Sequence, residues 1–434
     1  MTSEELARSI VARLRAAGQQ AYLVGGCVRD LLLGREPKDF DVATDARPDR
    51  VSELFERSEL VGAHFGVVLV RENTAQVEVA TFRSDVSYSD GRRPDAVHFE
   101  TDPRQDVLRR DFTINALLLD PETNQVLDFT GGREDLARGI ISAIGNPEER
   151  FEEDHLRLIR AVRFAARLGF TIEPATMAAI QRLHSLIANV SPERVRDELA
   201  RILTEGGARR GFELLDESGL LAEILPEVAA MKGVRQPPQF HPEGDVWTHT
   251  LLLLEKLNHP TLTLAAGALL HDVGKPPTFR IAERIRFDGH AEEGARMTHQ
   301  ILSRLRFSGE QTERVEALVA NHMRFMHSRQ MRDSTLKRFL RMENFPELLE
   351  LHRLDCMAGS GQLDNYKFAL QKLEEMGEQE LRPKPLLTGD DLIAEGYPPG
   401  PAFKKMLDAV EDAQLEGRVH TKEDALALVR QQFG

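Results

Sequence analysis

The pattern of apolar and polar positions changes about a third of the way along the chain. Up to about residue 145, short apolar runs predict strands, with helical stretches between them, at residues 22–24, 40–43, 67–70, 77–82 and 116–119. Beyond Asn146 the apolar positions recur at helical spacing, first over residues 154–168, 174–188 and 192–203. The chain is therefore expected to begin with one α/β or α+β domain and to continue as helices.

Proline-rich breaks divide the helical part further. Pro237-Pro238 with His241-Pro242 indicates a linker, and residues 383–385 hold a second break. The length of 434 residues suits about two to four domains. We expect four parts: residues 1–145, 146–236, 237–380 and 381–434.

Composition narrows the function classes. A hydrophobic fraction of 41% excludes a disordered or collagen-like chain. The net charge of −14 argues against a protein that coats nucleic acid indiscriminately, although a local basic groove stays open. Two cysteines, Cys27 and Cys356, are too few for a disulfide framework or a Cys-rich zinc site. With no signal peptide and no apolar run long enough to cross a bilayer, we expect a soluble cytoplasmic protein.

Two carboxylates near the N-terminus suggest metal chemistry. Asp39 and Asp41 are two positions apart, so on a strand both side chains leave the same face. Such a pair repels itself unless cations lie between the carboxylates, and Mg²⁺ suits carboxylates combined with substrate phosphates. Two ions there can clamp an in-line phosphoryl displacement. An isolated Asp-x-Asp, however, is usually a solvated strand face.

The surroundings of this pair favour the functional interpretation. A glycine turn before a helix lets backbone N–H groups approach a phosphate, arginines bind phosphate in bidentate fashion, and Asn can bond a ribose hydroxyl. Each element alone is as well explained by a turn or a surface ion-pair cluster. Together they predict a nucleotide-binding site formed by Gly25, Gly26, Arg29, Arg109, Arg110, Asp111 and Asn115, with Glu78 as a candidate third carboxylate.

These motifs carry a family resemblance. The run GG-x-VRD-x-LLG-x(4)-DFD, the RRDFTINAL block and DFTGG at residues 128–132 resemble the head of class II tRNA nucleotidyltransferases. That family comprises CCA-adding enzymes, is related to bacterial poly(A) polymerases, and is more distantly related to the DNA polymerase β superfamily. The resemblance implies an α+β fold with a polymerase-β-like head and an all-helical remainder. It makes Asp39 and Asp41 the Mg²⁺-binding catalytic pair, with Glu78 a weaker third candidate.

A second group of residues offers a base-reading site. In EDHLRLIR, residues 153–160, a helix would bring Asp154 and Arg157 together. Cytosine and adenine each present an amino donor beside a ring acceptor, whereas uracil and guanine present a carbonyl beside a ring N–H. A carboxylate that accepts and a guanidinium that donates therefore select CTP and ATP. The alternative is an ordinary solvated basic face that also includes Arg160, Arg163 and Arg167.

The resemblance extends over this region. The family motif Glu-Asp-x-x-Arg is complete at Glu153, Asp154 and Arg157, and SPERVRDEL at residues 191–199 resembles a later neck motif. A helix capped by Ser191 would brace the base-reading helix. Residues 84–99 include a polar segment, expected to be a loop, with Asp90, Gly91, Arg92, Arg93 and Pro94. Family members that stop after CC lack most of this loop, so its presence implies addition of the terminal A.

A third group predicts a metal centre in residues 237–380. His249, the adjacent His271-Asp272 pair and Asp355 are candidate ligands for Mn²⁺, Ni²⁺ or Mg²⁺ on separate helices, with Lys275 placed to contact a phosphate. His290 and His322 are candidates for a second ion. A lone histidine is more often a core residue, and His241 receives no role beyond the surface or the surroundings of the site. The H…HD…D pattern resembles HD phosphohydrolases, which implies phosphatase and 2′,3′-cyclic phosphodiesterase action; a structural or RNA-binding module is the alternative.

The leading hypothesis is an enzyme that builds or repairs the CCA end of tRNA from CTP and ATP without a nucleic-acid template, with a C-terminal HD hydrolase. An A-adding enzyme or a poly(A) polymerase acting on RNA 3′ ends is the nearest alternative. An HD nucleotide hydrolase with an inactive head belongs to a different class, and the intact head motifs argue against it. The expected partner is the acceptor end of tRNA, and the oligomeric state stays open.

Overall fold

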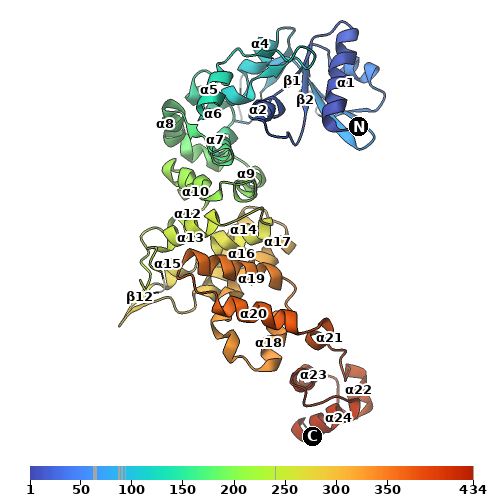
Figure 1. Cartoon of the computed structure of the whole chain (residues 1–434), viewed down its shortest axis with the longest axis vertical. Coiled ribbons are helices and arrows are strands. Elements are labelled where there is room, and N and C mark those ends of the chain that lie inside the picture. The colour runs from blue at the N-terminus through green and yellow to red at the C-terminus, as the bar shows by residue number, and fades with distance from the viewer. Residues whose placement is uncertain (62–65, 87, 89–90, 93, 240, 434) are drawn as a thin grey trace. The chain divides into compact units, whose positions relative to one another are not determined.

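The computed structural model describes the chain except for residues 62–65, 87, 89–90, 93, 240 and 434 (Figure 1). Its internal contacts define two compact units, Met1–Ala229 and Ala230–Gly434. The first contains a mixed sheet with helices and the second is almost entirely helical, which confirms the predicted α+β fold. The four-part division stays a prediction.

The head of the N-terminal unit is built on a seven-stranded sheet in the order β3-β4-β5-β2-β1-β8-β9. Strands β2 and β5 pair in parallel, and the other neighbours pair antiparallel. The predicted strand at 40–43 in fact begins one residue later. The strands are β1 (Ala21–Val24), β2 (Asp41–Thr44), β3 (Ser58–Leu60), β4 (Val67–Glu72), β5 (Ala75–Thr81), β8 (Leu118–Leu119) and β9 (Val126–Leu127).

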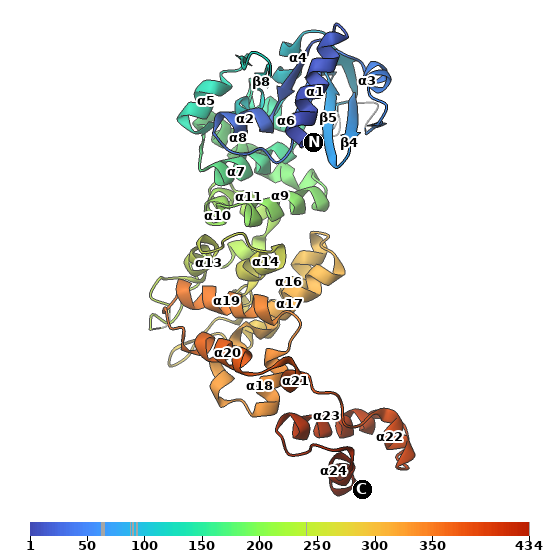
Figure 2. The same ribbon diagram turned by 45° about the vertical axis from the view of Figure 1, so that its right-hand side comes forward.

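Helices and a hairpin complete the head. Helix α1 begins at a capping box formed by Thr2 and Glu5, and it packs its apolar face on β1, β2 and β5 (Figure 2). A core cluster that includes Val24, Ala43 and Phe82 packs the sheet against later segments of the head, through residues such as Val107 and Ile144. These elements are α1 (Ser3–Ala16), α2 (Gly26–Leu32), α3 (Pro48–Leu54), the hairpin of β6 (Arg83–Val86) and β7 (Ala96–Phe99), α4 (Pro103–Leu108), the 3₁₀ helix η2 (Thr113–Asn115) and α5 (Gly132–Arg138).

The segment from β10 to α12 follows the head within the same unit and is called the neck. Its central helix is α7, which packs against α9 and α10. The predicted helix over 154–168 begins only at Leu156, because Asp154 has extended backbone angles (φ −143°, ψ 105°) between two helices. The predicted helix over 174–188 divides into an α-helix and a 3₁₀ helix. The elements are β10 (Ile140–Ile141), α6 (Pro147–Glu153), α7 (Leu156–Leu168), β11 (Thr171–Ile172), α8 (Pro174–Leu183), η3 (His184–Asn189), α9 (Pro192–Thr204), α10 (Ala208–Glu217), α11 (Leu220–Ile224) and α12 (Pro226–Ala229).

The C-terminal unit is a helical bundle followed by a small group of helices with a core of its own around Leu392, Met406 and Val410. Helix α14 is apolar on all sides and is buried along its length. Over the described ranges, no helix is long and apolar enough to cross a membrane. The elements are α13 (Val246–Glu255), α14 (Leu262–Leu270), α15 (Lys275–Thr278), the hairpin of β12 (Arg280–Ile281) and β13 (Ile285–Arg286), α16 (His290–Arg304), α17 (Gly309–Asn321), η4 (His322–Gln330), α18 (Asp333–Leu340), α19 (Phe345–Ala358), α20 (Asp364–Glu375), α21 (Glu378–Leu381), α22 (Gly389–Ala394), α23 (Pro401–Leu415) and α24 (Lys422–Phe433).

Candidate functional site

The predicted carboxylates of the head gather where β2 begins. Asp41 pairs in register with Glu78 of the parallel strand β5, so these side chains leave the same face of neighbouring strands. Asp39 precedes β2 and is exposed. Burial, together with the negative charges of Glu78 and Asp39 and against the opposing charge of Arg110, raises the pKa of Asp41 to about 6. Crowded carboxylates of this kind favour a bound cation, although among the described residues their oxygens do not all lie within 4.8 Å of one another.

Gly25 lets the chain turn tightly beside these carboxylates. Its φ is 80°, and a Cβ there would lie 3.3 Å from Arg110 Nη1 and 4.0 Å from Asp41 Oδ2. The backbone before α2 therefore lies against both a guanidinium and a candidate metal ligand. Arg109 and Arg110 both donate to the buried Asp106, at 2.6 and 3.0 Å. Burial alone would raise the pKa of Asp106, but these two charges outweigh it and lower the pKa.

The other predicted phosphate and ribose contacts of the head are engaged with one another. Arg29 is buried and donates to Asn115 Oδ1 at 2.6 Å and to Asp30 Oδ1 at 2.9 Å. Asn115 Nδ2 donates to Asp111 Oδ1 at 3.1 Å. In this structure these side chains therefore bind one another and support the backbone around the site.

The two residues of the predicted base-reading pair, Asp154 and Arg157, lie at the break between α6 and α7. The prediction that they are neighbours on one helix is wrong, because Asp154 precedes the helix. Arg157 donates to Glu153 Oε2 at 2.6 Å and to the carbonyl oxygens of Arg150 and Arg109 at 2.9 and 3.1 Å. These three acceptors fix the guanidinium against both the head and the neck.

Arg160 and Arg163 were predicted on a basic helix face, yet each has a buried acidic partner. Arg160 Nε donates to Asp111 Oδ2 at 2.9 Å, and Arg163 bonds to Glu198 of α9. The ring of Phe164 lies between the guanidinium groups of Arg163, Arg160 and Arg29, at 4.1, 5.3 and 5.3 Å. This network ties the neck to the head instead of presenting a solvated basic face.

The SPERVRDEL motif forms the N-terminal part of α9, and this helix packs against α7, as predicted. Its Arg194 and Glu198 bond to Asp154 and Arg163, and sequence reasoning did not single out either residue. Ser191 stands at the N-cap position, but within the described chain its side chain accepts no capping hydrogen bond, so the predicted cap is wrong.

The polar segment predicted between the head strands lies partly outside the described residues, including Asp90 and Arg93. Its described part meets the base-reading region. The carbonyl of Gly91 accepts from the N–H of His155 at 3.1 Å, and a Cβ on Gly91 would lie 2.4 Å from the His155 ring.

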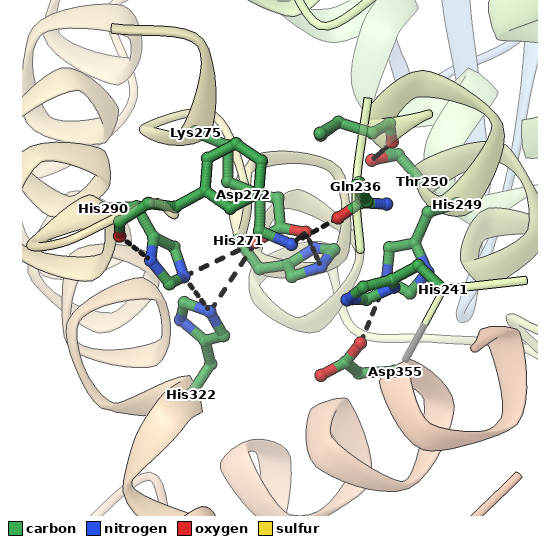
Figure 3. Close-up of polar contacts among 12 residues, drawn as sticks. Gln236, His241, His249, Thr250, His271, Asp272, Lys275, His290, His322 and Asp355 are labelled. Atoms are coloured by element: carbon green, nitrogen blue, oxygen red, sulfur yellow. Dashed lines mark hydrogen bonds and ion pairs between the residues drawn. The ribbon is translucent and has the colours of Figure 1, made fainter. Parts of the chain in front are cut away.

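The structure brings the predicted ligands of the C-terminal unit into two adjacent groups (Figure 3). Each group contributes ligand atoms that all lie within 4.8 Å of one another. Figure 3 shows Asp272 between them, and its Oδ1 lies 3.8 Å from Nε2 of both His290 and His322. The groups are His249, His271 and Asp355, and Asp272, His290 and His322.

Backbone carbonyls orient three of these imidazoles. The Nδ1 atoms of His271, His290 and His322 lie 2.9, 2.8 and 2.6 Å from the carbonyl oxygens three residues earlier. Nδ1–H donation to a carbonyl leaves Nε2 as the free ligand atom, the usual arrangement in metal sites. Nε2 of His249 lies 3.0 Å from Asp355 Oδ1, and Nε2 of His271 lies 3.2 Å from Asp272 Oδ2, so both nitrogens face carboxylates of this centre. Imidazole nitrogens beside carboxylates fit a divalent transition metal.

Charges in this centre are strongly coupled. Burial lowers the pKa of His322 to about 4, with the nearby His271 adding to the effect. His249 is buried too, but hydrogen bonds to Asp355 and Glu243 reverse the effect and raise its pKa to about 9. Burial alone would raise the pKa of Asp272, yet the charges of His271 and Lys275 hold it well below its usual range.

Four residues around the centre differ from the predicted picture. Lys275 Nζ donates to Asp272 Oδ2 at 2.7 Å and to Gln236 Oε1 at 2.6 Å, so this buried ammonium is held against the candidate ligands rather than free in the cavity. Glu243 Oε1 bonds to His249 Nδ1 at 2.6 Å and to His241 Nδ1 at 2.9 Å. Sequence reasoning missed Glu243, Gln236 and the place of His241, and their only signal was proximity to the His249 motif.

A cavity of about 910 Å³ opens beside the metal-type groups. Its lining holds basic, acidic and apolar side chains, including Lys275, Arg284, Arg286 and Arg329, Asp272, Asp288, Asp355 and Asp364, and Phe287 and Met326. The arginines offer contacts for a phosphate group beside the metal-type groups.

Comparison with known protein families finds three matches along the chain. Residues 21–142 match the poly(A) polymerase head domain, residues 169–232 match the probable RNA and SrmB-binding site of polymerase A, and residues 245–355 match the HD domain. A CC-adding tRNA nucleotidyltransferase of Thermus thermophilus is 37% identical over 428 residues, which cover 95% of this chain and 93% of that protein. A CCA-adding enzyme of Enterococcus faecalis is 40% identical over 259 residues, 58% of this chain and 63% of its own length.

Among solved structures, the Bacillus stearothermophilus CCA-adding enzyme in complex with CTP matches with a TM-score of 0.77 and 28% identity, covering 100% of this chain and 98% of that one. A poly(A) polymerase-type head joined to an HD domain defines a class of two-unit nucleotidyltransferases. The chain belongs to the tRNA nucleotidyltransferase family, which confirms the resemblance seen in the sequence.

Proposed function

We propose that this enzyme adds the terminal CCA to tRNA, using CTP and ATP. The observation that carries the proposal is the crowding of Asp41, Glu78 and Asp39 beside the Gly25 turn and Arg110. These carboxylates repel one another and lie next to a guanidinium. This arrangement is better explained by the binding of a metal-bound triphosphate than by a solvated strand face. Cytoplasmic location belongs to the same proposal, since tRNA and both triphosphates are found there.

In this proposal Asp39 and Asp41 hold Mg²⁺, with Glu78 as a third acid. When bound, Mg²⁺ neutralises the negative charge that develops on the phosphate, and it makes the attacking 3′ hydroxyl a better nucleophile. Arg110 and the backbone at Gly25 receive the triphosphate, because Gly25 lies beside both Arg110 and Asp41, and Gly26 continues this turn. Arg29, Asp111 and Asn115 act indirectly in this proposal. They fix the segment that carries Arg110 and the glycine turn.

Base choice rests on Asp154 and Arg157. The guanidinium donates to the ring acceptor of cytosine or adenine, and the carboxylate accepts from the amino group. Uracil and guanine would oppose donor to donor and acceptor to acceptor, which a polar site rejects strongly. Arg157 donates to three acceptors within the protein, which supports this role, because its guanidinium is then held in place before the substrate binds.

Addition of CC alone is the second candidate, since the Thermus thermophilus relative that matches over most of this chain is named a CC-adding enzyme. The contact of Gly91 with His155, next to Asp154, favours addition of the terminal A.

For the C-terminal unit we propose a metal-dependent phosphohydrolase. His249, His271 and Asp355 would hold one divalent ion, and Asp272, His290 and His322 a second one. The support is that the ligand atoms of each group all lie within 4.8 Å of one another. Ions bound there would supply hydroxide at neutral pH. The arginines of the cavity would hold the phosphate ester, and Lys275 and Glu243 would fix Asp272 and His249.

The test of the head is incorporation of labelled CTP and ATP into tRNA that lacks CCA. Asp39→Ala and Asp41→Ala should each abolish incorporation with Mg²⁺ while tRNA binding is retained. Either variant extending tRNA at a near wild-type rate would overturn the metal assignment.

A further inference from the structure

Asp154 owes its orientation to side-chain contacts rather than to a helix. It lies in extended backbone between α6 and α7, so helical geometry does not direct its carboxylate. Its Oδ1 accepts from the N–H of Leu156 at 3.1 Å. Arg194 Nη2, from α9, donates to Oδ2 at 3.0 Å and to Oδ1 at 3.2 Å. The backbone contact holds one oxygen, whereas Arg194 donates to both.

The two residues of the base-reading pair are held by different elements. Arg157 bonds to Glu153 and to two carbonyl oxygens, and none of these partners is on α9. Asp154 depends on α9 through Arg194, whose side chain is 24% exposed against 18% for Asp154. Arg194 also lines a small cavity of about 440 Å³ with Gly91 and Ser191, so it stands beside the segment that meets His155.

We propose that Arg194 is a positioning residue that determines base specificity. Its guanidinium fixes the plane of the Asp154 carboxylate, so that one oxygen keeps a lone pair directed at the amino group of the incoming base. The inference rests on the proposed role of Asp154 and Arg157. It adds a third residue, on another helix, whose effect on base choice passes through Asp154.

The physical reason is the angular dependence of hydrogen bonds. A hydrogen bond prefers a donor angle above about 150° and weakens steeply below about 120°, so a carboxylate free to rotate loses part of its bond to the correct amine. Rotation also relieves the clash with a carbonyl of uracil or guanine, because the acceptor can turn away. Both changes lower discrimination, whereas the chemical step, which takes place at the head carboxylates, is not directly affected.

The experiment measures kcat/KM for single additions of all four triphosphates to tRNA lacking CCA. Arg194→Ala should lower the CTP:UTP ratio by about tenfold or more, mainly through KM for CTP. Arg194→Lys should retain part of the ratio, because an ammonium keeps the charge and can donate to the carboxylate, but its flexible stem fixes the carboxylate plane less firmly than the planar guanidinium does. Arg196→Ala is the matched control: Arg196 is on the same helix, pairs with its neighbour Asp197, and its loss should leave the ratio unchanged.

A double-mutant cycle separates this role from general support of the neck. In an Asp154→Ala background, Arg194→Ala should cause no further fall in the ratio, because its effect acts through the missing carboxylate. An unchanged ratio in Arg194→Ala, or a further fall in the Asp154→Ala background, would overturn the inference. If Arg194→Ala does not fold, the folded Arg194→Lys variant decides by its ratio alone.

The proposed function and this inference fail in different ways. A wild-type enzyme that does not prefer CTP and ATP, or an Asp154→Ala variant with wild-type preference, would refute the base-reading pair itself. Wild-type preference that is lost in Asp154→Ala but kept in both Arg194 variants would refute only the role of Arg194.

Discussion

Asp41 shows how a single residue can serve a site at the expense of stability. Its strand position beside Glu78 and its burial raise its pKa from the usual value of 3.8 to about 6. Folding therefore favours the protonated carboxyl and disfavours the ionised one. The cost is absent below pH 3.8, grows between pH 3.8 and 6, and is fully present at pH 8.

Asp41→Asn should consequently stabilise the metal-free protein while abolishing nucleotide addition. Each pKa unit corresponds to about 1.4 kcal/mol, and after allowance for solvent screening we expect a gain of about 1–2 kcal/mol at pH 8. Calorimetry in EDTA should show a Tm higher by a few degrees at pH 8, with the difference shrinking as the pH falls toward 4. A variant with no gain in Tm at pH 8 would contradict the electrostatic account of this cluster.

Arg157→Ala should relax base choice rather than only slow the reaction. The guanidinium is predicted to donate to the ring nitrogen of cytosine or adenine, and its loss removes the donor that opposes the N–H of uracil or guanine. The ratio of kcat/KM for CTP over UTP should fall by at least about tenfold, or about 1.4 kcal/mol. A slower enzyme with the wild-type ratio would show that Arg157 serves only the structure of the neck.

The role of a single residue could be predicted from the sequence only when that role did not depend on a partner far away along the chain. Asp39, Asp41 and the HD ligands could be proposed because residue type and spacing suggest their chemistry. The acid partners of Arg160 and Arg163 lie 49 and 35 positions away, and no local pattern indicates such pairs. Helical periodicity identified a basic face correctly, but it could not show that tertiary packing buries that face.

At the scale of elements, close backbone approach decides where the HD ligands meet. A Cβ on Gly274 would lie 2.2 Å from the carbonyl oxygen of His290 and 2.5 Å from the nitrogen of Gly294. The start of α16 therefore packs directly on the turn that follows Asp272. This contact explains why a glycine follows the His271-Asp272 pair, and it sets the distance between the two halves of the centre.

Gly274→Ala should displace α16 and weaken metal binding by at least about tenfold, because neither backbone group can move aside easily. Titration of the metal-free protein with Mn²⁺ would measure the change. Gly309→Ala is the control, because its Cβ would meet no atom within 4 Å. Wild-type affinity for Mn²⁺ in the Gly274 variant would show that the contact does not position the ligands.

Element boundaries were harder to predict than element types. The strand and helix segments of the head follow from apolar spacing, and the bundle follows from helical periodicity. The break at Asp154 does not, because the residues on both sides of it favour helix, and the Asp154 side chain at this break bonds to Arg194 of α9, 40 positions away. Such a break is visible only once α9 is packed against α7.

On the scale of the whole molecule, the two candidate sites lie in different compact units. The head carboxylates belong to residues 1–229 and the HD ligands to residues 230–434. Asp272→Ala should thus abolish any Mn²⁺-dependent phosphohydrolase activity and reduce bound metal, yet leave nucleotide addition within about twofold of wild type. A large loss of nucleotide addition in the folded variant would show that the two units are catalytically coupled.

The central claim is that this chain completes the CCA end of tRNA, and the sequence of the product tests it most directly. Purified enzyme is given tRNA that lacks CCA, with CTP alone, with ATP alone, and with both, and the 3′ ends are sequenced. We predict ends in CC with CTP alone and ends in CCA with both triphosphates. Ends that stop at CC in the presence of both triphosphates would support the CC-adding alternative, and tRNA left unextended in every reaction would contradict the account.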